Sequence, residues 1–565
     1  MTQRFLFFGL LFLLTLVRFW ATGGMELAPD EAYYRLWSER LDWSYYSKGP
    51  GVAFAIAAGT ALAGVTELGV RFLSPLLAFG SSLLVYALVR QFHSVGAAAW
   101  TVVVLAVLPI FSVGGLIMTI DPLSIFFWLA AFLTTVKATQ SGRWYWWLGT
   151  GLLIGIGFLC KYTNAFQLLS VLLVMLVLRR QRPQIWRGGL FLVLLGFALT
   201  CWPPIIWNAE HNWITVTHLA ERSAVGEAVD RGWDPWQLPI FIGLHAGVYS
   251  PLVFLGFVVA LVWCLQRAQH QIEARVSLCF VLPILATYSI ISIFKAGEAN
   301  WTLPGMVTLG LFAVPAWLQF IERHGAWRWP AAAALALALL MSASVVNTDF
   351  LRALGAPWPY ERDPSTRLRA WQSSSEALAL VREEFEKRLQ AESFLIANKY
   401  GTAAALEFYL PTWLPARPGH PKIYTPGGPS IQNQYAFWGR YDEHELLEGG
   451  VLPAWYDDRT YTEEMGVNLF EGRTALFVTD EANPEFAGLL KWDDEGDGPA
   501  PWAESEQPDD LDAELSHPYS PISAYQVRRS FEWTQPLADV LISRRDQPIR
   551  MLRIFACFRY RVPDL

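Results

Sequence analysis

The sequence predicts a polytopic α-helical membrane protein with about 11–13 transmembrane helices, followed by a soluble C-terminal α/β domain. Of its 565 residues, 53% are hydrophobic and only 16% are charged, a composition typical of membrane-spanning chains. Apolar stretches long enough to cross a bilayer recur up to about residue 346, and beyond it they stop. We therefore predict a transmembrane domain over residues 1–346 and a C-terminal domain over residues 347–565.

Most apolar stretches have the length that a spanning helix needs, which is roughly 20 residues. The first, 4–22, also fits the apolar core of a signal peptide, but no clear small-x-small cleavage site precedes Glu26, which favours a retained helix. The stretch 51–65 is short and rich in Gly and Ala, so it is either a span or an interfacial or re-entrant helix. The other candidate spans are 70–90, 97–117, 121–137, 145–161, 163–178, 188–207, 238–264, 277–294, 302–321 and 329–346.

The basic residues indicate which ends of these helices face the cytoplasm. Lysine and arginine in short loops stay on the cytoplasmic side, and the basic connections fall there if the N-terminus is inside. The residues concerned are Arg90, Lys137, Arg143, Arg179, Arg180, Arg182, Arg187, Arg267, Arg275, Arg323 and Arg328. The connections 23–69 and 208–237 and the C-terminal domain are then predicted to lie outside.

A folded domain is predicted beyond residue 347. Residues 370–390 carry apolar side chains at helical spacing, with charged residues on the other face. Short β-like runs follow at 394–397, 422–424, 475–479 and 551–555. The segment 490–520 is rich in Asp, Glu, Pro and Ser, which predicts an exposed loop.

Charge and cysteine content exclude some functions. The net charge is -7, and acidic residues crowd the last third, so the chain offers no basic surface for nucleic acid. Of five cysteines, only Cys557 lies in the C-terminal domain, which therefore has no internal disulfide. None of the cysteines shows metal-ligand spacing. We predict no cofactor; a divalent metal is conceivable, but no clear site supports one.

The connection after the first span carries the most unusual polar pattern. Asp30 and Glu31 are adjacent acids at the membrane rim, where a carboxylate can take a proton from an acceptor hydroxyl or amine. Aromatic residues and a lysine follow, among them Tyr33, Tyr34, Tyr46 and Lys48. A lysine there can hold a lipid phosphate as a point charge. Alternatively, the acids cap a juxtamembrane helix and the aromatic residues form an interfacial belt.

Further charged residues lie at the ends of predicted spans on the same side. Asp121 precedes a proline between two apolar stretches, so it is either an inward-facing functional acid or a helix N-cap. Lys161, followed by Tyr162, ends one span and Lys295 ends another. Lysines on this side oppose the positive-inside trend. They either snorkel toward lipid headgroups or form a site for phosphate at the bilayer surface.

Two more polar clusters complete the set. Asn300 next to Trp301 suits a sugar, although a tryptophan at this place also suits an interfacial belt. His211 lies in the loop 208–237 among scattered acids, which is weak support for a metal site. We interpret all these clusters as parts of one active site.

These motifs, in this order, resemble the GT-C membrane glycosyltransferases. The nearer match is the bacterial branch that includes protein O-mannosyltransferases and lipid A aminoarabinose transferases. The motifs that carry the resemblance are Asp30 to Tyr34, Trp43 to Pro50, Asp121-Pro122, Lys161-Tyr162, Asn300 to Pro304, Tyr400 to Pro411 and Asn433 to Trp438. The resemblance covers most of the chain, and the acid pair is its most specific motif.

The resemblance implies the roles of individual residues. Asp30 would be the catalytic carboxylate, supported by Glu31, and Asp121 matches an acid at the same helix junction in the family. Lys48 would bind the donor phosphate, helped by Lys161 or Lys295. The residues expected to contact substrate are Tyr33, Tyr34, Tyr46, Tyr162, Asn300 and Trp301. The chain departs from the family at Gly49, where Lys-Pro-Pro is usual, so a looser loop around Lys48 is expected.

The implied activity is transfer of one sugar from a polyprenyl-phosphate donor to an envelope acceptor, by an inverting single displacement. The reaction would take place at the outer face of the bacterial inner membrane. Lipid A, another glycolipid or polysaccharide, and protein all remain as acceptors, and the donor sugar is open. A flippase or transporter is the alternative, but it would carry ionisable groups near the bilayer midplane. A scaffold with an outer domain would not need acids and lysines at the rim.

Overall fold

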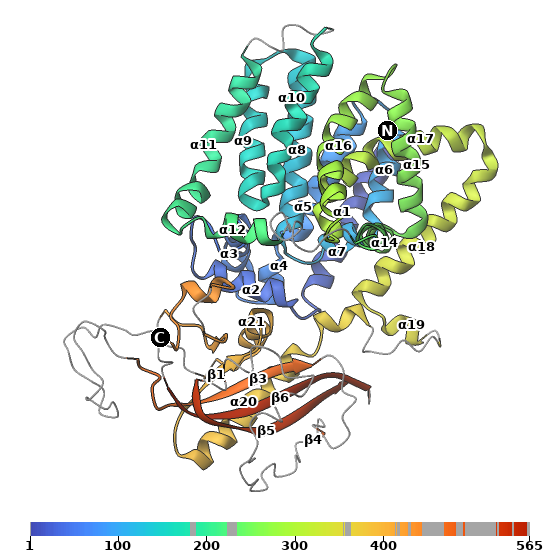
Figure 1. Cartoon of the computed structure of the whole chain (residues 1–565). Coiled ribbons are helices and arrows are strands. Elements are labelled where there is room, and N and C mark those ends of the chain that lie inside the picture. The colour runs from blue at the N-terminus through green and yellow to red at the C-terminus, as the bar shows by residue number, and fades with distance from the viewer. Residues whose placement is uncertain are drawn as a thin grey trace. The chain divides into compact units, whose positions relative to one another are not determined.

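The computed structural model (Figure 1) describes residues 2–180, 188–222, 234–353, 363–412, 419–427, 431–442, 468–481, 490–491, 530–544 and 547–561, and the single residues 355, 414 and 527. The chain forms two compact units. The first comprises Met1–Met25 and Tyr34–Gly355, and the second comprises Glu26–Tyr33 and Ala356–Leu565. The division falls inside helix α2 (Pro29–Ser38), so one short helix contributes residues to both units.

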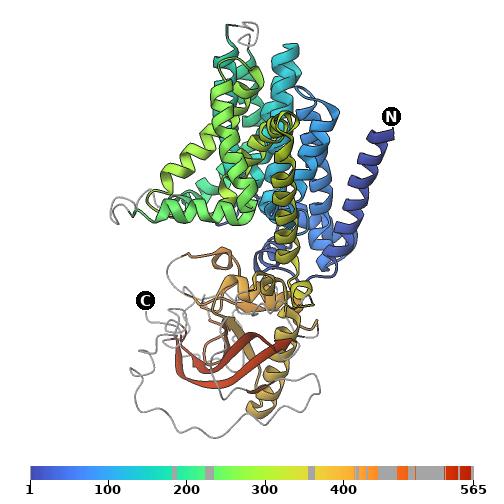
Figure 2. The same ribbon diagram turned by 90° about the vertical axis from the view of Figure 1, so that its right-hand side faces the viewer.

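The first unit is helical throughout its described part (Figure 1). Its longer helices are α1 (Thr2–Thr22), α5 (Leu73–Val89), α8 (Ile120–Ser141), α9 (Trp144–Cys160), α11 (Gly189–Glu210), α15 (Pro251–Arg267), α16 (Ile272–Ile291), α17 (Leu303–Arg323) and α18 (Arg328–Val346). The shorter ones are α3 (Gly51–Ala63), α4 (Glu67–Arg71), α6 (Val95–Ala106), α7 (Pro109–Gly114), α10 (Phe166–Leu178), α12 (Ile214–Arg222), α14 (Gln237–Tyr249) and α19 (Asp349–Ala353). Helices α8, α9 and α11 pack side by side, and Figure 2 shows α1, in dark blue, at the edge of the bundle, where it packs on α5.

The predicted class, a polytopic α-helical membrane protein, is confirmed. Within the described residues, seven helices are long and apolar enough to cross a membrane, or eight if a bent pair counts as one span. Four shorter apolar segments accompany them, at Gly51–Ala63, Val95–Ala106, Trp144–Cys160 and Tyr162–Leu178. The short stretch predicted at 51–65 is thus the 13-residue helix α3.

Two stretches predicted as continuous spans are broken. The stretch 97–117 forms α6 and α7, because Pro109 lacks an N–H and begins a new helix after Leu108. The stretch 238–264 forms α14 and α15, which meet at an angle of 113°. Ser250 between them has a φ of 65° and precedes Pro251. A residue before proline is driven out of the helical region, so the first helix ends there.

Buried polar contacts hold the centre of the bundle in register. Trp128 of α8 is fully buried, and its Nε1–H donates to Thr308 Oγ1 of α17 at 2.9 Å. Gln167 Nε2 of α10 donates to the backbone oxygen of Trp128, also at 2.9 Å. Leaving such buried donors unpaired would cost about 1–3 kcal/mol each. These contacts therefore fix α8 against α10 and α17, whose ends carry the candidate site.

The second unit contains a mixed six-stranded sheet in the order β2-β1-β3-β6-β5-β4. Strands β1, β2 and β3 run parallel, whereas β3, β6 and β5 are antiparallel neighbours. The strands are β1 (Ser393–Ala397), β2 (Ile423–Tyr424), β3 (Thr474–Glu481), β4 (Leu490–Lys491), β5 (Phe531–Arg544) and β6 (Gln547–Tyr560), and the helices are α20 (Trp371–Leu389) and α21 (Tyr400–Tyr409).

The predicted soluble α/β domain is confirmed in its main elements. The helix predicted over 370–390 is α20, and the four β-like runs fall on β1, β2, β3 and β6. Strand β5 was missed because Pro536 interrupts it, and the pairing register shifts between Pro536 and Ala538. The first two residues of the exposed loop predicted at 490–520 form strand β4. The rest of that segment, 492–520, lies outside the described residues.

The second unit includes a short piece of the N-terminal half of the chain. The backbone N–H of Trp371 donates to Glu26 Oε2 at 2.5 Å. The hydroxyl of Tyr33 accepts from the backbone N–H of Gln434 at 2.6 Å, and its ring stacks on Tyr435 at 5.9 Å. Tyr33, which was predicted to contact substrate, is only 4% exposed. Its contacts within the second unit account for this burial.

The substitution Tyr33→Phe tests this packing role. It leaves the buried N–H of Gln434 without its acceptor, so we expect a loss of about 1–3 kcal/mol in the stability of the second unit. Tyr33→Ala also removes the stacked ring and should cost about 3–5 kcal/mol. The rate of proteolysis of purified full-length protein measures both. Tyr145→Phe is the control, because that hydroxyl is bonded at the exposed surface, and a Tyr33→Phe protein as resistant as this control would contradict the assignment.

Candidate active site

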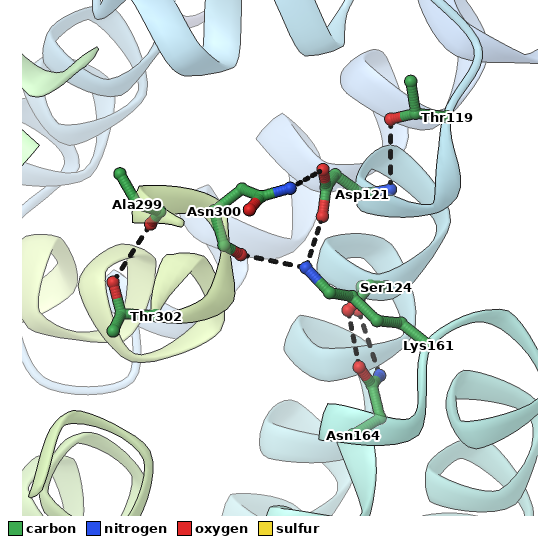
Figure 3. Close-up of polar contacts among 8 residues, drawn as sticks. All are labelled: Thr119, Asp121, Ser124, Lys161, Asn164, Ala299, Asn300 and Thr302. Atoms are coloured by element: carbon green, nitrogen blue, oxygen red, sulfur yellow. Dashed lines mark hydrogen bonds and ion pairs between the residues drawn. The ribbon is translucent and has the colours of Figure 1, made fainter. Parts of the chain in front are cut away.

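Asp121, Lys161 and Asn300 meet in one hydrogen-bonded cluster in the first unit (Figure 3). Lys161 Nζ donates to Asp121 Oδ1 at 2.6 Å and to the backbone oxygen of Asn300 at 2.9 Å. Asn300 Nδ2 donates to Asp121 Oδ2 at 3.0 Å. The structure therefore brings together three residues that the sequence predicted as members of one site.

The cluster joins the ends of three helices. Asp121 lies in the first turn of α8, Lys161 terminates α9, and Asn300 belongs to a 3₁₀ turn just before α17. The N-cap of α8 is Thr119, whose Oγ1 accepts the N–H of Asp121 at 3.3 Å. The alternative that Asp121 is itself the N-cap is therefore wrong, although the helix N-terminus still favours its negative charge.

A second polar contact sets the position of the Lys161 backbone. Ser124 Oγ donates to Asn164 Oδ1 at 2.5 Å, and Asn164 Nδ2 returns a bond to the backbone oxygen of Ser124 at 3.1 Å (Figure 3). Both side chains are buried, and each lies three residues beyond a member of the ion pair. The sequence analysis missed both residues, although an asparagine at the start of an apolar stretch was a usable signal.

The ion pair is shielded from water. The side chains of Lys161 and Asp121 are 8% and 18% exposed, respectively. Both carboxylate oxygens of Asp121 accept hydrogen bonds, one from Lys161 and one from Asn300, so its side chain is occupied in holding the helix ends together. Asn300 Oδ1 is buried and has no hydrogen-bond partner among the described residues. The geometry thus favours a positioning role for Asp121 and leaves an amide oxygen available to a ligand hydroxyl.

A cavity of about 310 Å³ lies beside the cluster. Its described lining includes Lys48 and Lys161, four aromatic residues and no acidic side chain. The aromatic residues are Tyr162, Phe166, Tyr288 and Trp301. Four predicted site residues, Lys48, Lys161, Tyr162 and Trp301, therefore share one cavity. Two ammonium groups in a mostly apolar wall suit an anionic ligand with an apolar part.

The loop that carries Lys48 is held by its backbone. The carbonyl oxygen of Lys48 accepts from the N–H of Tyr45 at 3.0 Å and from Ser44 Oγ at 3.3 Å. Ser44 Oγ also lies 3.1 Å from the hydroxyl of Tyr162, and Thr215 Oγ1 donates to the backbone oxygen of Tyr45 at 3.1 Å. Ser44 was not among the predicted site residues, yet it links the Lys48 loop to the end of α9.

Gly49 does not loosen this loop, contrary to the prediction. A Cβ atom at Gly49 would lie 2.3 Å from the carbonyl oxygen of Leu159 in α9, closer than real Cβ atoms come to backbone. Only glycine therefore allows the chain to pass so near α9. Gly49 fixes the position of Lys48 through close backbone packing.

Three other predicted residues of the first unit lie outside the described lining of this cavity. Lys295 follows α16 and is half-buried. Tyr34 packs edge-on against Trp37 with ring centroids 4.9 Å apart, and Tyr46 packs against His218 of α12 at 4.5 Å. Packing contacts account for the burial of both tyrosines.

Asp30 and Glu31 belong to the second unit, and they differ in burial. Glu31 is fully buried, and its Oε2 accepts the backbone N–H of Ala28 at 3.0 Å, three residues earlier. This is the reaching-back half of a capping box, so the capping alternative describes Glu31. Asp30, in the first turn of α2, is exposed.

Possible metal ligands do not gather at one place among the described residues. No group of three or more His, Cys, Asp or Glu side chains that could hold a metal ion occurs in the part of the chain that the structure describes. His211 Nδ1 lies 2.7 Å from the backbone oxygen of Trp207, and its ring stacks on the Trp207 ring at 3.9 Å. His211 thus closes the end of α11.

Comparisons with known proteins bear on the class of protein. Residues 47–207, which include Lys48, Asp121 and Lys161, match the family model of dolichyl-phosphate-mannose-protein mannosyltransferases. The chain is 26% identical over 321 residues to the lipid A galacturonosyltransferase RgtD of Rhizobium johnstonii. That match covers 56% of this chain and 64% of the relative, so it spans a little less than two thirds of the relative's length.

The fold comparison extends over nearly the whole chain. The crystal structure of ArnT from Cupriavidus metallidurans bound to undecaprenyl phosphate matches with a TM-score of 0.56 and 14% identity, over 97% of this chain and 98% of ArnT. The same protein in its apo state matches with a TM-score of 0.54 and 15% identity, over 96% and 97% of the two chains. The chain therefore has the GT-C fold, and the predicted resemblance to GT-C membrane glycosyltransferases is confirmed.

A double-mutant cycle tests the ion pair. Asp121→Ala leaves Lys161 charged and buried, and Lys161→Met does the same to Asp121, so each should cost about 3–5 kcal/mol. The double variant should cost clearly less than the sum, as measured by the thermal unfolding midpoint of purified protein. The exposed pair Lys387–Glu383 is the control, with side chains 65% and 43% exposed, and its two substitutions should be additive because solvent screens such a pair. Additive losses at Asp121 and Lys161 would contradict the pairing.

Proposed function

We propose that this chain transfers a single sugar from a polyprenyl-phosphate donor to lipid A or a related envelope glycolipid. The observation that carries the proposal is the cavity shared by Lys48 and Lys161 next to Asp121 and Asn300. The GT-C fold and the family match over residues 47–207 support the same reaction class.

The cavity is suited to the donor. A sugar linked to a polyprenyl phosphate carries one phosphodiester charge between a polar sugar and an apolar chain. Lysine ammonium groups bind phosphate as point charges, and aromatic rings beside them offer apolar faces to a sugar or a prenyl chain. Lys161 is paired with Asp121, and Lys48 is the other ammonium group of the described lining. We assign the donor phosphate to Lys48, with Lys161 adding a hydrogen bond, as the resemblance to GT-C transferases implies.

The acceptor class is supported by the relatives. RgtD is a lipid A galacturonosyltransferase by its name. The ArnT structure of similar fold holds undecaprenyl phosphate, which supports the donor class instead. Protein remains the second candidate acceptor, because the family model takes its name from protein mannosyltransferases.

The chemistry is assigned to Asp30. An acceptor hydroxyl is a poor nucleophile at neutral pH, so its proton passes to the Asp30 carboxylate as its oxygen attacks the anomeric carbon. The new glycosidic bond forms while the bond between the anomeric carbon and the phosphate oxygen breaks, and the polyprenyl phosphate leaves with the electron pair. Attack and departure on opposite faces invert the anomeric centre. Glu31 supports Asp30 by capping α2.

The placement of charge argues against a flippase. Asp121 and Lys161 lie at helix ends, whereas a transporter carries its ionisable groups near the bilayer midplane. We place this end of the helices, together with the C-terminal unit, on the outer side of the inner membrane, because the basic connections favour that orientation.

Substitution of Lys48 tests donor binding. Lys48→Ala should weaken binding of a polyprenyl-phosphate sugar by roughly 10- to 150-fold, because a charge-assisted contact contributes about 1.5–3 kcal/mol. Lys48→Arg should lose less, since the charge survives. Native mass spectrometry of the purified protein measures the affinity. Lys295→Ala is the control, because Lys295 does not line the cavity. Wild-type affinity in Lys48→Ala would remove the support for this site.

Substitution of Asp30 tests the base. Asp30→Asn keeps the shape of the side chain but removes the proton acceptor, so turnover should fall by about 10²- to 10⁴-fold while folding and donor binding are retained. Glu31→Ala should instead lower stability by about 1 kcal/mol, through loss of the cap. Transfer assays and unfolding midpoints separate the two effects. Near-normal turnover in Asp30→Asn would make Asp30 a structural residue.

A further inference from the structure

Arg18 is a charged residue inside the first spanning helix, one turn before α1 ends at Thr22. Its side chain is buried within the protein, with a relative exposure of only 6%. Among the described residues the guanidinium has no ion pair or hydrogen-bond partner, and Nη1 is fully enclosed. A charged group at this depth is costly unless an opposite charge meets it, so the feature requires an explanation.

Arg18 lines a cavity of about 410 Å³ that is separate from the cavity of Lys48. At one end this second cavity reaches Asp121 and Asn300, and at the other it reaches Leu129, which lies eight residues further along α8. Eight residues of helix span about 12 Å. Most of the remaining lining comes from apolar residues of α5, α6, α7, α8 and α17. We call this cavity the Arg18 groove; it has the shape and polarity to hold a hydrocarbon chain with a polar head at one end.

The wall of the groove is built around the guanidinium. A Cβ atom at Gly115, the C-cap of α7, would lie 2.9 Å from both Cζ and Nε of Arg18. Glycine at this position therefore leaves the room that the planar guanidinium occupies. An arginine that merely snorkels to the bilayer surface would extend toward the headgroups, whereas this side chain is buried in the wall of a partly open cavity.

We propose that Arg18 binds the phosphate head of an amphiphile whose hydrocarbon chain lies in the Arg18 groove. A guanidinium presents several N–H donors in a plane and pairs with phosphate oxygens by two parallel bonds. Nη1 is shielded from solvent, and a contact between a cation and a phosphate is stronger where water has little access. Asn300 Oδ1, buried and without a partner among the described residues, is at hand for a hydroxyl of the same ligand.

Two lipids carry this chemistry, and the inference rests on the proposed function for their identity. One is the polyprenyl phosphate of the donor, and the other is a phosphorylated glycolipid acceptor such as lipid A. Because the Lys48 cavity suits the donor phosphate, the Arg18 groove, which reaches Asp121 and Asn300 of the same cluster, is assigned to the acceptor. The assignment gives the two substrates separate cationic anchors.

The experiment measures binding of defined lipids to the purified full-length protein by native mass spectrometry. The probes are undecaprenyl phosphate, undecaprenol, and lipid A with and without its phosphates. Arg18→Gln should weaken binding of diphosphoryl lipid A by about 10- to 100-fold, and Arg18→Lys should weaken it less. Binding of undecaprenol and of dephosphorylated lipid A should not change. Arg4→Gln is the matched control, because Arg4 lies on the same helix and is exposed.

Gly115→Ala is a second variant that keeps the charge. Its methyl group would displace the guanidinium, so it should weaken binding of the same lipid, even if Arg18→Gln folds poorly. Loss of undecaprenyl phosphate binding in both variants, with lipid A unaffected, would assign the groove to the donor. Wild-type affinity for both phosphorylated lipids in both variants would overturn the proposal.

Lipid binding and sugar transfer are measured separately, so failure of one can be told from failure of the other. A protein that binds lipid A through Arg18 but transfers no sugar would contradict the proposed function and leave the Arg18 site standing. A protein that transfers sugar, and whose Arg18→Gln variant binds every probe like wild type, would contradict the Arg18 site alone.

Discussion

The ion pair between Asp121 and Lys161 is the interaction on which the candidate site depends. It joins the beginning of α8 to the end of α9, and through Asn300 it also holds the beginning of α17. Neither charge is tolerated alone at such low exposure, because desolvation costs several kcal/mol per ion. The pair therefore permits one arrangement of the three helix ends, and its two members line two separate cavities.

Backbone packing places the other cation. The backbone carbonyl oxygen of Lys48 accepts two hydrogen bonds within its own loop. Gly49 lets that loop lie directly against α9. A ligand-binding side chain needs such support, because an anchor that is loose by about 1 Å loses much of its effect. The region thus combines one lysine fixed by an ion pair with a second lysine fixed by its main chain.

The partition between the two cavities suggests how two lipid substrates stay distinct. Lys161 faces the cavity that also contains Lys48, while Asp121 and Asn300 line the Arg18 groove. A single hydrogen-bonded cluster therefore contacts both spaces. In the proposed reaction the donor and acceptor phosphates are held by different cations, which keeps like charges apart while the reacting groups approach each other.

The sequence by itself determined the membrane class, helix α20, four of the strands and most of the polar residues that cluster. These features follow from local hydropathy and periodicity, which are written in consecutive residues. It also carried signals that the spans break at Pro109 and Ser250, where proline chemistry acts locally. The roles of Asn164 and Ser44 could not be predicted from the sequence, because they depend on partners far away in the chain.

Only the tertiary structure decided what each candidate residue touches. Glu31 and Asp30 are neighbours in sequence, yet one is buried as a cap and the other is exposed. The sequence around Gly49 predicts a flexible loop. The loop is held in place only because the end of α9 passes beside it. In the sequence, Arg18 is simply a basic residue near the end of a span. Its burial without a hydrogen-bond partner among the described residues depends on which helix faces meet. Such contacts are set by packing between distant segments, which no local pattern encodes.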